Sequence, residues 1–91
     1  MKILTRILDN YFTEKLIKKI KQKFCMYDIE ILYSNNKDYV QIFVNNRGKN
    51  EFKNPRKLAK IHKEESFELL LSNNFFKNLK DYMKTILNMS M

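Results

Sequence analysis

The sequence predicts an α+β fold in one domain, residues 1–91, with a helix at the N-terminus, an antiparallel β-hairpin in the centre and two helices at the C-terminus. Three observations support this order. Apolar residues have helical spacing over the first 25 residues, alternate with polar residues from position 27 to 44, and return to helical spacing after position 75. With 91 residues and 44% hydrophobic content, the chain can bury one core.

The apolar face of the first helical region changes direction near its middle. On a helical wheel, the apolar residues of 3–11 lie nearly opposite those of 12–24. One straight helix would therefore be apolar all round. The alternative is a kinked helix pair with a break at 9–13, in which Thr13 caps the second helix and Phe12 packs against Ile17. We favour the break. Opposite the apolar stripe of the second segment lies a basic ridge formed by Lys15, Lys18, Lys19 and Lys21.

Two alternating runs joined by the Asn-rich loop 34–38 predict the central hairpin. The side chains expected to face the helices are Ile29, Ile31, Val40, Ile42 and Val44. Tyr39, Gln41 and Phe43 would then face outward on an open sheet face. Exposed aromatic rings such as Tyr39 and Phe43 suit stacking on unpaired bases, contact with another helix, or a homodimer. The sequence leaves these alternatives open.

The chain after the hairpin is turn-rich and basic, and then becomes helical in pattern. Residues 51–53 suit either a short third strand or a loop. Asn54 and Pro55 are typical of a helix start, because Asn caps well and Pro fits the first helical position. We therefore expect a helix over 55–71, although 66–71 also suits a strand. The last helix follows 72–74, and its expected core residues are Phe75, Leu79, Met83 and Ile86.

The net charge of +8 is concentrated in two windows. Residues 13–24 carry a net +4, residues 45–63 carry a net +6, and the other 60 residues sum to −2. Charge placed this way indicates a polyanionic partner, most simply nucleic acid, with duplex DNA favoured over RNA. The predicted junction of loop and helix near Pro55 would add free N–H groups as phosphate donors.

The basic side chains divide into two predicted contact groups. The main phosphate contacts are Lys49, Lys53, Arg56, Lys57, Lys60 and Lys63, with Arg47 placed to reach a groove. The ridge of Lys15, Lys18, Lys19 and Lys21 forms the second contact.

The sequence gives little support to catalysis or to metal and cofactor binding. His62 is the only histidine, and it falls on the apolar side of the predicted helix, where a structural role is typical. Adjacent Glu64 and Glu65 point about 100° apart on a helix and suit a solvated face. One cysteine excludes an internal disulfide, and Cys25 suits a small hydrophobe near a helix end. We expect no enzyme, no metal and no cofactor.

One segment resembles a known family. Arg56-Lys57-Leu58-Ala59-Lys60 is similar to the Lys-Lys-x-Ala-Lys signature that opens the last helix of double-stranded RNA-binding domains, and the expected order of elements over 13–71 is comparable, as an αββ(β)α arrangement. The family's Ala-rich continuation and its Gly-Pro hairpin loop are absent. A winged-helix arrangement, with two helices meeting near Thr13 and residues 27–45 as the wing, would instead imply DNA as ligand.

A rival class is a protein that binds another protein. The abundance of Lys, Asn and Ile against one Ala, one Gly and one Pro suggests an AT-rich genome, such as that of a phage or plasmid. Small proteins of mobile elements often inhibit host nucleic-acid enzymes, as anti-CRISPR proteins do, and a basic surface suits that role. No apolar run approaches the roughly 20 residues of a membrane span, so we expect a cytoplasmic protein with no membrane partner.

Overall fold

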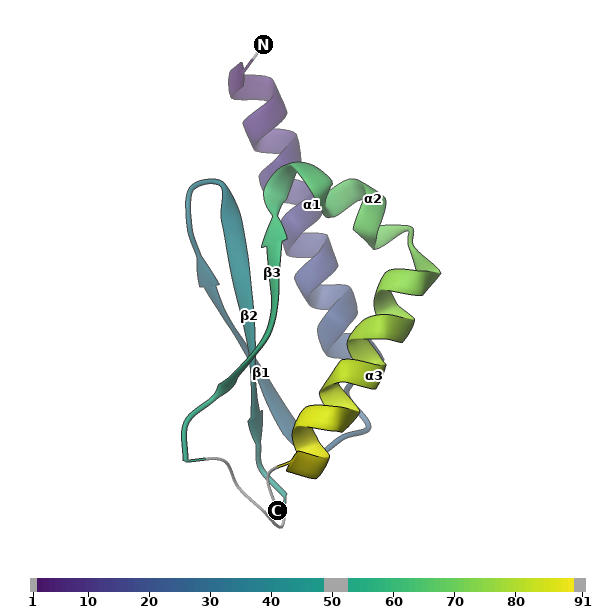
Figure 1. The fold of residues 1–91 in the computed structure, drawn as a ribbon. Coiled ribbons are helices and arrows are strands. Elements are labelled where there is room, and N and C mark those ends of the chain that lie inside the picture. Colours follow the sequence, from purple (N-terminus) through teal and green to yellow (C-terminus); the bar gives the residue numbers. More distant parts are fainter. Residues whose placement is uncertain (1, 49–52, 90–91) are drawn as a thin grey trace.

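The N-terminal segment forms one uninterrupted helix, α1 (Lys2–Lys23), in a computed structural model that describes residues 2–48 and 53–89 (Figure 1). The predicted break at 9–13 and the kinked helix pair are therefore wrong, as is the winged-helix arrangement built on them. Thr13 caps no second helix, because its hydroxyl lies within α1 and donates a hydrogen bond to the carbonyl oxygen of Asp9, 2.6 Å away. Such a bond to the preceding turn lets a threonine occupy a helix interior.

The rotated apolar face of α1 has a different explanation from a break. Only the second half of the helix lies against the core, where Leu16 and Ile20 are fully buried. The apolar residues of the first half, such as Leu4 and Ile7, are exposed, and this end of α1 extends past the sheet (Figure 1). The apolar residues in the second half of α1 therefore pack in the core, whereas those in the first half are exposed to solvent.

The predicted hairpin is confirmed as β1 (Ile29–Asn35) and β2 (Tyr39–Asn46), which pair antiparallel. The connecting loop is closed by a hydrogen bond from the amide of Asn36 to the carbonyl of Tyr39, 2.9 Å long. The expected inward face is also confirmed. Val40, Ile42 and Val44 are fully buried, and Ile29 and Ile31 pack against the same cluster.

The segment predicted as a helix over 55–71 is mostly not helical. Residues 56–62 form a third antiparallel strand, β3 (Arg56–His62), which gives the sheet the order β1-β2-β3. A short 3₁₀ turn, η1 (Lys63–Glu65), and a five-residue helix, α2 (Ser66–Leu70), follow. Residues 66–71 are thus largely helix and not strand. The proposed strand at 51–53 falls mainly on residues 51 and 52, which lie outside the described residues.

A β-bulge explains why β3 has a helix-like pattern. Ile42 pairs with Ala59 and Phe43 pairs with Lys57, so that Leu58 is an extra residue on β3. An extra residue shifts the alternation of side chains by one position. Leu58 and Ile61 are both buried although three positions apart, a spacing that in a regular sequence pattern indicates a helix.

The expected αββ(β)α order is confirmed, but the motif that carried the RNA-binding resemblance does not have the predicted structure. Residues 56–60 would open a helix in that family, whereas here they lie inside β3. Consequently, no helix N-terminus near Pro55 supplies N–H groups to phosphates.

The last helix is confirmed as α3 (Asn73–Met89), which completes the predicted pair of C-terminal helices. The hydroxyl of Ser72 accepts a hydrogen bond from the amide of Phe75 at 3.1 Å and so caps the helix start. Leu79, Met83 and Ile86 are buried as expected. Phe75 is half-buried, and its neighbour Phe76 takes the buried position.

All the helices lie on one side of the sheet (Figure 1). One apolar cluster fills the space between α1, α3 and the inner face of the sheet, and its buried members are Leu16, Ile17, Ile20, Phe24, Val40, Ile42, Val44, Leu58, Ile61, Phe76, Leu79, Met83 and Ile86. No described helix or strand covers the opposite face, where side chains of β2 remain partly exposed. The fold therefore has two layers and one open sheet face.

A buried pair of hydroxyl groups joins α1 to α2. Thr13 Oγ1 and Ser66 Oγ lie 2.7 Å apart, and both residues are almost completely buried. Because the single Thr13 hydroxyl proton is directed to the carbonyl of Asp9, Ser66 donates and Thr13 accepts. The pair fixes the position of α2 on α1 without leaving either hydroxyl unsatisfied.

Candidate nucleic-acid interface

The open sheet face carries two aromatic rings on its central strand. Tyr39, Gln41 and Phe43 alternate with the buried residues of β2 and are all partly exposed, as predicted. Tyr39 and Phe43 are four residues apart, which corresponds to about 13 Å along a strand. Gln41 lies between them on the same face and offers both a donor and an acceptor. The strand thus presents two flat apolar surfaces with a polar side chain between them.

Two lysines of β3 lie beside these rings. Lys57 is the partner of Phe43 and Lys60 is the partner of Gln41 in the strand register, so both share the outer face. In a regular strand, residues three positions apart face opposite sides. The bulge at Leu58 is what brings Lys57 and Lys60 to one face. The two lysines and two aromatic rings together are called the sheet-face site below.

A side-chain contact already connects two members of the sheet-face site, Lys60 and Tyr39. Lys60 Nζ lies 4.2 Å from the centroid of the Tyr39 ring, within cation–π distance. The imidazole of His62 stands 6.3 Å from the same ring. His62 is thus exposed at the end of a strand and not buried on a helix, contrary to the sequence interpretation. The sequence interpretation missed this position next to Tyr39, because the apolar residues around His62 have helical spacing.

Arg47, predicted to reach a groove, is engaged at the base of the sheet. Its guanidinium donates a hydrogen bond to Glu30 of β1 in an ion pair whose two side chains are 49% and 40% exposed. The amide of Arg47 also donates to the carbonyl of Asp28 at 2.9 Å. A polyanion would compete with Glu30 for Arg47, so we do not place Arg47 in the sheet-face site.

Two other predicted contacts of the second basic window, Lys53 and Arg56, lie together near the start of β3, whereas Lys63 lies apart from them. Arg56 pairs with Val44, which places it toward the helix side of the sheet edge. With Lys53 and Lys57 it borders a surface hollow next to Tyr82 of α3. Lys63 is only 8% exposed and lies at the opposite end of β3. Lys49 lies outside the described residues.

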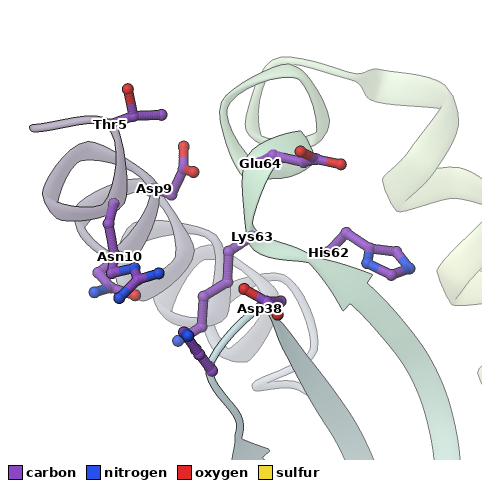
Figure 2. Close-up of a pocket in the computed structure, with 9 residues that line it drawn as sticks. Thr5, Asp9, Asn10, Asp38, His62, Lys63 and Glu64 are labelled. Carbon is purple, nitrogen blue, oxygen red and sulfur yellow. The ribbon is translucent and has the colours of Figure 1, made fainter. Parts of the chain in front are cut away.

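Lys63 borders a surface hollow of about 700 Å³, shown in Figure 2. The hollow lies between α1, the β1–β2 loop and the end of β3. Its acidic and basic groups balance, and they are Arg6, Asp9, Lys37, Asp38, Lys63 and Glu64. The amide of Lys63 donates to the carbonyl of Asp38 at 2.9 Å, while His62 turns away from α1 (Figure 2). A balanced hollow of this kind does not select a polyanion.

The four lysines of the predicted basic ridge lie on α1, and their contacts differ. Lys19 Nζ donates to the carbonyl of Leu70 at 2.8 Å and lies 4.6 Å from the Phe76 ring centroid, so it holds α2 and α3 against α1. Lys21 Nζ lies 5.5 Å from the ring centroid of Tyr33 on β1. Lys15 and Lys18 remain exposed and border a hollow that also includes Lys19, Gln22, Lys23 and Leu70.

The two basic groups face opposite sides of the molecule. Lys15 and Lys18 lie on the side of α1 away from Leu16 and Ile20, which point into the core. These lysines therefore lie on the far side of α1 from the core, with Lys18 also bordering a hollow beside Tyr33 of β1, whereas Lys57 and Lys60 lie on the outer face of the sheet. A single straight duplex therefore has no common surface on which to contact both groups.

The described residues contain no cluster of three or more His, Cys, Asp or Glu side chains that could hold a metal ion. Cys25 follows the end of α1 as expected, but its side chain is exposed and does not serve as a small core residue. Glu64 and Glu65 lie in the short turn η1 and not on the surface of a long helix.

Comparisons of the chain with protein-family models, with curated proteins and with solved structures find no match. Among the described residues, no helix has both the length and the apolar content needed to cross a membrane.

Proposed function

We propose that this protein binds nucleic acid, and that the sheet-face site contacts a single-stranded segment. The observation that carries the proposal is the shared outer face of Tyr39, Phe43, Lys57 and Lys60, with the two lysines on the strand next to the two rings. Single strands expose the flat faces of their bases, whereas a duplex stacks them away from such a surface. The proposal therefore favours a single-stranded ligand over the duplex DNA that was expected from charge alone.

The chemistry of the site suits both parts of a nucleotide chain. Aromatic rings stack on bases of any sequence, and Lys side chains neutralise the phosphates between them. The spacing of about 13 Å between Tyr39 and Phe43 leaves room for a base over Gln41. Lys60, which lies over the Tyr39 ring in the free protein, would move aside to a phosphate as a base takes its place. Binding by stacking would have little sequence preference.

The test is a fluorescence anisotropy titration with a labelled single-stranded DNA of about 12 nucleotides, a matching RNA and a DNA duplex, each across a salt series. With two to three phosphates neutralised, log K should fall by about 1.4 to 2.1 per log unit of salt. Phe43→Ala should weaken binding of the single strands roughly tenfold, because base stacking on a ring contributes about 1–3 kcal/mol. Lys57→Glu with Lys60→Glu should abolish it.

The matched control is Lys15→Glu with Lys18→Glu, which makes the same change of charge on the opposite side of the molecule. Equal losses from both double variants would mean a response to net charge alone and would refute the sheet-face site. Loss from the α1 variant only would assign binding to the ridge on α1. No binding of any nucleic acid at about 50 mM salt would remove the proposal and favour a protein target of the inhibitor class.

A further inference from the structure

The outer side of α1 carries an exposed apolar stripe. Its four residues follow helical spacing, i, i+3, i+4 and i+7, and are Leu4, Ile7, Leu8 and Tyr11. Their exposed fractions are 61%, 58%, 46% and 51%. A stripe of this length covers about 10 Å of helix and faces away from the buried side of α1. We call these four residues the α1 stripe.

The stripe continues onto α2 through aromatic contacts. The Tyr11 ring meets the Phe12 ring edge-on at a centroid distance of 5.3 Å, and Phe12 meets Phe67 of α2 at 4.8 Å. Phe67 is itself 43% exposed. These contacts join the α1 stripe to a second exposed apolar side chain and give one contiguous patch. Contiguous apolar patches on small proteins mark sites of association.

The same side of α1 changes abruptly from apolar to basic. Lys15, one turn after Tyr11, places its Nζ 5.1 Å from the Tyr11 ring centroid. Lys18 follows on the same side of the helix. The stripe therefore has a polar, positively charged border at one end, which limits how a partner helix can align with it.

We propose that the α1 stripe is the interface of a homodimer in which the α1 helices of two copies pack antiparallel. An antiparallel pair matches Leu4 with Tyr11 and Ile7 with Leu8 of the second copy, so each apolar side chain meets another. This seam has the spacing by which helices pack in pairs. A second copy is the occupant because the stripe is complementary to itself under two-fold symmetry.

Charge selects the antiparallel orientation over the parallel one. In a parallel pair, the Lys15 side chains of the two copies would lie side by side, and so would the Lys18 side chains. In the antiparallel pair, the two Lys15 residues are separated by about 22 Å along the helix axis at 1.5 Å per residue. That distance exceeds the Debye length of about 8 Å at physiological salt, so their repulsion is screened.

The proposed dimer leaves the sheet-face site free. The stripe lies on the side of α1 opposite the buried residues Leu16 and Ile20, so both open sheet faces remain accessible in the pair. Because the interface consists of four side chains per copy with a border at α2, it falls in the size class of transient complexes. We therefore expect dimerisation that depends on concentration.

The test is sedimentation velocity from about 10 µM to about 500 µM, where a reversible dimer shows a mass that rises with concentration. The mass should rise from 11.1 kDa toward about twice that value in the wild type. Ile7→Glu, at a position 58% exposed in the monomer, should weaken dimerisation at least tenfold. The matched control is Met26→Glu, at an apolar position 74% exposed and outside the stripe, which should dimerise like the wild type.

Cysteine cross-linking tests the orientation. In a Cys25→Ser background, Leu4→Cys mixed with Tyr11→Cys should form a disulfide-linked dimer faster than either protein alone. Faster cross-linking of Leu4→Cys alone would overturn the antiparallel arrangement. A wild type that stays at 11.1 kDa throughout would overturn the dimer.

Binding to vesicles of phosphatidylcholine and phosphatidylserine that Ile7→Glu abolishes, without self-association, would also overturn the dimer and assign the stripe to a lipid surface. Nucleic-acid binding per monomer should be unchanged in Ile7→Glu, so the failure of one proposal is distinguishable from the failure of the other.

Discussion

The two faces of β2 carry side chains in opposite surroundings, although they alternate along one strand. The inner residues Val40, Ile42 and Val44 are fully excluded from solvent and belong to the same buried cluster as residues of both long helices. The outer residues Tyr39, Gln41 and Phe43 remain partly exposed next to the lysines of β3. The inner face stabilises the fold, and the outer face has side chains that the fold does not require. Residues of the outer face are therefore free to serve binding.

The largest expected difference between the faces is in stability. Ile42→Ala should lower the free energy of unfolding by about 2–5 kcal/mol, because the removed side chain leaves a cavity in the core that the surrounding residues fill only partly. Phe43→Ala, one position along the strand, should lower it by about 1 kcal/mol or less, since the lost contacts are cross-strand pairs on a solvated face. Urea denaturation followed by circular dichroism measures both. Equal losses would mean that the outer face is covered in solution.

The buried polar contact between α1 and α2 should have the next largest effect. Thr13→Val keeps the shape of the side chain but removes the acceptor for Ser66, and leaving a buried hydroxyl unsatisfied costs about 1–3 kcal/mol. The double variant Thr13→Val with Ser66→Ala should recover part of that loss, because no unpaired hydroxyl remains. A double-mutant cycle in urea measures the coupling. Strict additivity would show that the two hydroxyls do not interact.

The smallest effect is expected on the exposed side. Arg47→Ala removes the ion pair with Glu30, and pairs this exposed contribute about 0–1 kcal/mol. The loss should shrink further in about 1 M salt, where the Debye length falls to about 3 Å. Thermal melts at low and high salt provide the measurement. A loss above about 2 kcal/mol would indicate that Arg47 organises the base of the sheet beyond this pair.

Local patterns predicted the elements whose residues follow one period throughout. Strand β2 alternates between buried and partly exposed residues from Tyr39 to Val44, and α3 keeps its apolar residues on one side. The α+β class and the order of its first and last elements followed from these patterns. The inward and outward faces of β2 followed as well, including the exposure of Tyr39 and Phe43.

The predictions for β3 and α1 were wrong for a related reason. In each element, the direction of the apolar residues changes partway along. In β3 the bulge at Leu58 shifts the alternation by one residue, so a strand acquires the spacing of a helix. In α1 the apolar residues of the first half point away from the core, so one helix acquires the pattern of two. Local sequence patterns do not distinguish these cases, because each depends on which neighbours the element meets.

The sequence by itself determined that this protein has one hydrophobic core, a central hairpin, an amphipathic last helix and a charge concentrated in two windows. These properties depend on the spacing of residues along the chain, because the period of a helix or strand places regularly spaced residues on one side. Only the tertiary structure decided that the two basic groups lie on opposite sides, and that Lys57 and Lys60 stand beside Tyr39 and Phe43. Those positions depend on strand pairing and on one extra residue in β3, and both arise from contacts between segments far apart in the chain.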